Sequence, residues 1–90
     1  MNEDSLRDLY DHLTATAERP VERTASRWLG EAEAIAGDVA EASMDPSVCR
    51  ERLEKVEQLL GNVDTTGDEA ADEHVAAAEA ILDELLDENS

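Results

Sequence analysis

The chain is nearly devoid of aromatic side chains and has few positive ones. Its 90 residues include no Phe, one Trp, one Tyr, one Cys and only seven Lys and Arg. A single cysteine excludes an intramolecular disulfide, and no group of Cys and His residues has the spacing of a zinc site. No stretch approaches the roughly 18 apolar residues of a membrane span, and the first residues lack the regions of a signal peptide. We therefore expect a soluble chain located in the cytoplasm, with no membrane partner.

Carboxylates are what the chain has in excess. Its 24 Asp and Glu residues give a formal net charge of -17. Such a charge can keep a chain disordered, but apolar residues at helical spacing indicate a folded domain instead. Salt at molar concentration shortens the Debye length to about 3 Å, which removes most of the self-repulsion. We interpret the surface as an adaptation to a high-salt cytoplasm and expect the domain to loosen in dilute salt.

The apolar spacing predicts four helices and no strand. We expect the helices at about residues 5–17, 20–42, 46–61 and 67–87, with capping boxes that begin at Ser5 and at Thr66. Asp45 precedes Pro46 as an N-cap, and Pro20 leaves either a turn or a kink at residues 18–20. Short connections between four helices predict a single all-α domain, an antiparallel four-helix bundle with a short first helix.

The second helix carries the most regular apolar pattern. Its predicted core line alternates spacings of four and three residues and comprises Val21, Ala25, Trp28, Ala32, Ile35, Val39 and Ala42. Trp28 is central in this line, so we expect it to be substantially buried.

Two apolar features exceed what the bundle needs. Gly30, Ala34 and Gly37 form a strip of small residues opposite the predicted core line, although a mid-helix glycine costs about 1 kcal/mol relative to alanine. The fourth helix has an apolar half, with Ile81 and Leu86 at its flanks, that is wider than one neighbour covers. We therefore predict an interface with a second copy or with a helical protein partner, formed by these five residues.

Potential catalytic groups do not form a convincing site in the sequence. Glu51 and Glu54 on the third helix and Glu84 and Asp87 on the fourth resemble the paired Mg²⁺ ligands of all-α nucleoside triphosphate pyrophosphohydrolases. On a helical wheel, however, both pairs point away from the apolar seams and toward water. We assign no catalytic, metal-binding or cofactor-binding residue.

The remaining reactive side chains have structural explanations. His12 follows Asp8 by one helical turn and is expected to form a surface pair with it, whereas His74 lies at the boundary of an apolar face. Cys49 stands where a hydrophobic staple would place a packing residue. The arginine stripe of the second helix lies in a chain of pI about 4.1, so nucleic acid is not an expected partner; it comprises Arg19, Arg23 and Arg27.

Three segments carry a resemblance to known proteins. Residues 9–13 (LYDHL), 27–32 (RWLGEA) and 69–75 (EAADEHV) resemble small acidic haloarchaeal proteins of unknown function. The resemblance implies a high-salt cytoplasm and assigns no activity. We interpret the chain as a non-enzymatic interaction module that forms a homodimer; the alternatives are the pyrophosphohydrolase-like enzyme and an acidic regulator that binds a basic protein surface.

Overall fold

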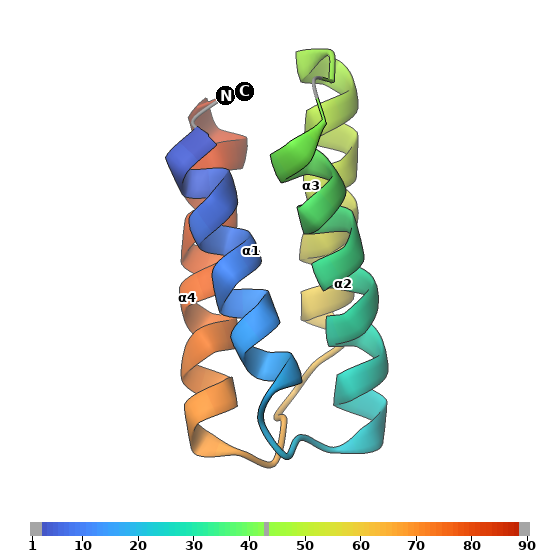
Figure 1. Ribbon diagram of the computed structural model, residues 1–90, viewed down its shortest axis with the longest axis vertical. Coiled ribbons are helices and arrows are strands. Elements are labelled where there is room, and N and C mark those ends of the chain that lie inside the picture. The colour runs from blue at the N-terminus through green and yellow to red at the C-terminus, as the bar shows by residue number, and fades with distance from the viewer. Residues whose placement is uncertain (1–2, 43, 89–90) are drawn as a thin grey trace.

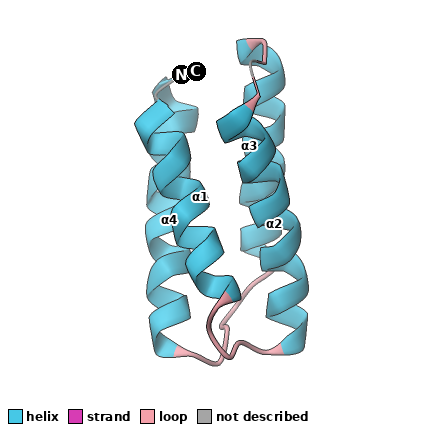
Figure 2. Cartoon of the chain, viewed as in Figure 1, coloured by secondary structure: helices cyan, strands magenta, loops and turns pink. Residues whose placement is uncertain are grey.

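Four helices account for most of the chain. The computed structural model describes residues 3–42 and 44–88, and its helices are α1 (Glu3–Ala17), α2 (Arg23–Glu41), α3 (Pro46–Gly61) and α4 (Glu69–Glu88). No strand occurs in these two stretches (Figure 2). The prediction of an all-α fold is confirmed.

The helices form an up-down-up-down bundle. Figure 1 shows that each helix runs opposite to the one before it. α1 and α4 lie side by side, and the beginning of α1 and the end of α4 are at the same end of the bundle. α1 packs against α2 and α4, and α3 packs against the same two helices from the other side. The four helices therefore form a ring in which each has two neighbours.

Leucines from all four helices fill the core, and α2 adds three buried alanines. The fully buried leucines and valine of α1, α3 and α4 are Leu9, Leu13, Leu53, Val56, Leu60, Leu82 and Leu85. The buried residues of α2 are Ala25, Leu29, Ala32, Ala36 and Val39. Three alanines on its inner face let α2 approach the leucines of its neighbours closely.

The core line predicted for α2 is therefore partly wrong. Leu29 and Ala36 are buried where Trp28 and Ile35 were expected, and those two are only half-buried at the edge of the core. Ala42 is exposed and Val21 precedes the helix. The indole is too bulky for a face that packs through alanine, so it lies at the margin with the Arg27 guanidinium 5.4 Å from its ring centroid.

The start of α2 also differs from the prediction. Residues 18–22 form a turn and a short extended stretch, and the helix begins at Arg23 rather than at Pro20. The Glu22 amide donates a hydrogen bond to the Thr66 carbonyl oxygen at 2.7 Å, and the Val21 amide donates to the Arg19 carbonyl oxygen. The bond from Glu22 ties the segment before α2 to the distant α3–α4 connection.

Two of the predicted N-caps are replaced by other residues or bonds. α1 already includes Glu3, so Ser5 lies within the helix and does not cap it. Before α4, Gly67 adopts a φ of +81°, which turns the chain and leaves Asp68 to accept a hydrogen bond from the Ala71 amide. Asp45 occupies the N-cap position of α3 as predicted, but its side chain makes no capping bond.

Candidate functional site

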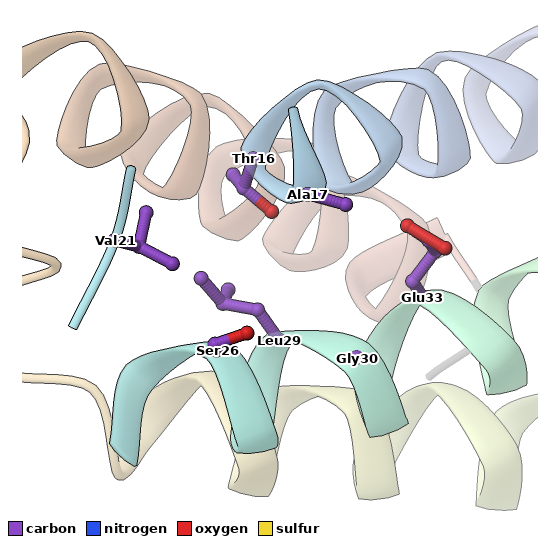
Figure 3. Close-up of a pocket in the computed structure, with 7 residues that line it drawn as sticks. All are labelled: Thr16, Ala17, Val21, Ser26, Leu29, Gly30 and Glu33. Carbon is purple, nitrogen blue, oxygen red and sulfur yellow. The ribbon is translucent and has the colours of Figure 1, made fainter. Parts of the chain in front are cut away.

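Two hollows with polar groups in their lining lie between α1 and α2, and together they are called the groove. Near the α1–α2 connection it contains a cavity of about 100 Å³, lined by Thr16, Ala17, Val21, Ser26, Leu29, Gly30 and Glu33 (Figure 3). A second hollow of about 260 Å³ follows along α2, lined by Tyr10, Glu33, Ala34, Gly37, Asp38 and Glu41. Glu33 lines both hollows and so divides the groove in two.

Glu33 places a carboxylate oxygen in a buried position within this groove. Figure 3 shows its side chain extending from α2 toward α1. Its Oε2 atom is buried and has no hydrogen-bond partner among the described residues, and the same is true of Thr14 Oγ1 on α1. Buried polar oxygens without partners are costly, so the α1–α2 seam is less well satisfied than the rest of the bundle.

The strip of small residues lies along this groove, and its members differ in their surroundings. A Cβ atom added to Gly30 would meet no other atom within 4 Å. A Cβ atom added to Gly37 would lie 3.0 Å from Tyr10 Cε1, so Gly37 makes room for the tyrosine ring of α1. Ala34 is exposed. The fold therefore explains Gly37 and offers no internal reason for Gly30.

The flanks of α4 are used within the bundle. Ile81 and Leu86 are half-buried and pack against the core. The Arg50 guanidinium donates a hydrogen bond of 3.1 Å to the Leu86 carbonyl oxygen, which places that flank next to α3. The wide apolar half of α4 thus has two neighbours, α1 and α3, and does not by itself require a partner. The interface assigned to these five residues stays a prediction.

The four carboxylates considered as metal ligands do not gather. Glu51, Glu54, Glu84 and Asp87 are all exposed. Within residues 3–42 and 44–88, no group of three or more His, Cys, Asp or Glu side chains could hold a metal ion. Cys49 is 7% exposed with its Sγ 3.8 Å from the Met44 carbonyl oxygen, a packing position at the beginning of α3.

The polar residues that do come together stabilise the base of the bundle. Arg19 binds Asp68 through two hydrogen bonds of 2.9 and 3.1 Å, which raises the pKa of the arginine. The same bonds, followed by the Ala71 amide, lower the pKa of the Asp68 carboxyl. Asp72 accepts bonds from the amide and hydroxyl of the fully buried Thr66, which lower its pKa. This cluster fastens the α3–α4 connection to the end of α1.

One protein family matches this chain. It is described as a domain of unknown function (DUF8152), and the match covers residues 5–90. The chain belongs to this family. No curated protein and no solved structure matches the chain. The match thus covers the bundle except for the first two residues of α1, and it assigns no activity. None of the described helices is long and apolar enough to cross a membrane.

Reading the residues one helix at a time misses one contact altogether. His12 was expected to pair with Asp8, but its Nδ1 lies 2.9 Å from Nδ1 of His74 on α4. A signal for this contact exists in the chain: His12 lies five residues before the end of α1, and His74 lies five residues after the beginning of α4. Antiparallel neighbours bring such positions to the same level of the bundle.

Proposed function

We propose that this domain is a non-catalytic interaction module that associates with a second copy through an exposed face of α2 that borders the hollows against α1. This face is a continuous stripe of exposed residues along the helix: Arg23, Arg27, Gly30, Ala34, Asp38 and Glu41. Gly30 carries the proposal. It lowers the helix propensity of α2 by about 1 kcal/mol relative to alanine, and the atoms around it leave its Cβ position empty. Close approach of another backbone would give this glycine a purpose.

The charges on this face favour one orientation of the two copies. Two arginines lie at its beginning, two carboxylates lie at its end, and small residues separate them. In an antiparallel crossing centred between Gly30 and Ala34, Arg23 of each copy faces Glu41 of the other. A parallel crossing would place like charges together. Such an arrangement has the two-fold symmetry of most homodimers.

The charged pairs set orientation more than affinity. An exposed ion pair contributes about 0.2–1 kcal/mol, and two copies of this chain each bring a net charge of -17. Neither Arg23 nor Arg27 has an ion-pair partner within the part of the chain that the structure describes. Both guanidinium groups can therefore pair across an interface without breaking an existing salt bridge.

Sedimentation velocity tests the association and its site. We expect a dimer for the wild type in 2 M KCl and a monomer for Gly30→Leu with unchanged helicity. Gly61→Leu is the matched control, because Gly61 also has no atom within 4 Å of its Cβ position but lies on α3. A monomeric wild type would overturn self-association. A Gly30→Leu dimer of undiminished affinity would place the interface elsewhere.

Charge exchange tests the orientation separately. In 0.3 M KCl, where the Debye length is roughly 6 Å, Arg23→Glu should weaken the dimer and the added change Glu41→Arg should restore it. If the wild type dimerises but Glu41→Arg does not restore the affinity lost in Arg23→Glu, the antiparallel crossing is excluded while self-association still stands.

A second candidate is an acidic regulator that binds a basic protein surface. The hollow lined by Tyr10, Glu33, Asp38 and Glu41 supports it, because three carboxylates beside an aromatic ring suit a guanidinium group. An arginine-rich peptide that perturbs Tyr10 and loses affinity in Glu41→Gln would favour this alternative over self-association.

We also propose that the domain works in a high-salt cytoplasm, as its resemblance to haloarchaeal proteins implies. The support is the excess of 24 carboxylates over seven basic side chains. The thermal midpoint should rise between 0.1 and 2 M KCl, and equal midpoints would argue against this setting.

A further inference from the structure

Two histidines from different helices face each other through the same type of nitrogen. His12 Nδ1 on α1 and His74 Nδ1 on α4 are 2.9 Å apart. Their ring centroids are 5.2 Å apart and the rings are tilted by 46°. The centroid distance exceeds the nitrogen distance by about the two ring radii, so the nitrogens point at each other head-on. This is the geometry of a linear N–H···N hydrogen bond.

Such a bond restricts the protons that the pair can carry. When both rings are neutral, one must hold its proton on Nδ1 and the other on Nε2, since a bare nitrogen must accept the bond. One added proton keeps the bond and makes its donor cationic, which strengthens it. A second added proton places two N–H donors and two positive charges against each other, and the contact must open.

We propose that His12 and His74 form one shared proton-binding site that fastens α1 to α4 and opens when both rings are protonated. Histidine is the side chain whose ordinary titration lies between about pH 5 and 8. The site therefore holds the two helices together at neutral pH and releases this contact in mild acid. The apolar packing of the α1–α4 seam and the Arg19–Asp68 pair at its end do not depend on this contact.

The charged residues next to the pair along the two helices are the exposed carboxylates Asp8 and Asp11 on α1 and Glu73 on α4. Ala70 and Ala77, which flank His74 on its own face, provide no competing hydrogen-bond partner. No hydrogen bond or ion pair in the described segments joins either ring to α2 or α3.

The same geometry distinguishes a proton from a metal ion as the ligand. An imidazole nitrogen binds zinc at about 2.0–2.1 Å, and two ligand nitrogens must then converge on a point beside the line between them. Nitrogens that meet head-on at 2.9 Å leave no room for an ion on that line. A proton fits this space.

Nitrogen-15 NMR of the imidazoles tests the site directly, because the chain contains only these two histidines. At pH 7.5 in 2 M KCl we expect one ring protonated on Nδ1 and the other on Nε2, followed by proton uptake in two separate steps. Two rings that both carry the Nε2 proton and titrate as identical independent groups would overturn the proposal.

Thermal unfolding tests the mechanical consequence. The comparison is the wild type against His12→Gln/His74→Gln, which keeps hydrogen-bonding side chains at both positions but cannot titrate. The carboxylates titrate in both proteins, so their effect cancels in the difference between the two midpoints. Between pH 7.5 and 5, the thermal midpoint of the wild type should fall by about 4–8 °C more than that of the variant. Parallel pH curves would overturn the proposal, and the NMR result stands even if the variant does not fold.

Discussion

Two glycine-to-alanine substitutions in α2 can distinguish the effect of helix propensity on stability from the effect of packing. Gly30→Ala and Gly37→Ala make the same chemical change in the middle of the same helix. Alanine is more favourable than glycine in a helix interior by about 0.8–1 kcal/mol, so propensity alone predicts equal stabilisation. The surroundings are different, because the new methyl group at position 30 enters open space and the one at position 37 meets the Tyr10 ring.

The distances determine the expected magnitudes. For Gly30→Ala the full propensity gain of about 1 kcal/mol should appear, which corresponds to a rise of about 4–8 °C in the thermal midpoint of a domain of this size. For Gly37→Ala the methyl carbon would lie 3.0 Å from Tyr10 Cε1. The ring must shift by a few tenths of an ångström, and overpacking of about 1 kcal/mol or more offsets the gain. Gly37→Ala should therefore be neutral or destabilising.

Denaturant unfolding in 2 M KCl, followed by circular dichroism at two protein concentrations, measures both free energies. The lower concentration reports on the isolated bundle, where association contributes least. Gly37→Ala/Tyr10→Ala removes the obstructing ring, so alanine at position 37 should recover its full stabilising effect in that background. A stabilisation of Gly37→Ala equal to that of Gly30→Ala, with Tyr10 present, would refute the close α1–α2 packing described above.

Two further predictions concern the core and the base of the bundle. Leu29→Ala should lower the free energy of unfolding by about 2–5 kcal/mol, more than Trp28→Ala, because Leu29 is buried in the core and Trp28 lies at its edge. Denaturant titration compares the two variants, and the reverse order would favour the core line predicted from the sequence. The Thr66 amide and hydroxyl lower the pKa of Asp72, so this carboxylate stabilises the fold above its ordinary value of 3.8, and the contribution is lost as pH falls through the lower pKa of the folded state. Asp72→Asn should therefore be less stable than the wild type at pH 7, and this gap should close in acid; a gap that is constant from pH 7 to 2 would contradict the hydrogen bonds to Thr66.

The apolar pattern was sufficient for the helices but not for their exact faces. Spacing located α3 to the residue, because Pro46 and Gly61 are local boundary signals. On α2 the same method placed Trp28 in the core. An apolar arc that touches two neighbours has a centre and two edges, and spacing alone does not tell which edge the bulky residue occupies.

Interactions between distant segments explain the other differences. α2 begins at Arg23, and the Glu22 amide just before it is bound by Thr66, a residue more than forty positions later. The pairing of His12 with His74 likewise depends on which helices are neighbours. Propensity and capping rules describe residues within one turn of each other, so neither contact follows from them. The strip of small residues that includes Gly30 could be found in the sequence. The role of Gly37 could not, because it depends on where the Tyr10 ring lies in the fold.

The ring of four helices has a consequence for how the chain folds. Three of its four contacts join helices that are consecutive in the chain, and they form by closing short connections. Only the α1–α4 seam brings together residues separated by most of the chain, 62 positions in the case of His12 and His74. Closing that one long loop carries the largest entropic penalty, and mostly local contacts favour folding within microseconds to milliseconds. The α1–α4 seam should thus form late, and interactions made there, including the contact of His12 with His74, should act mainly on the rate at which the folded state is lost.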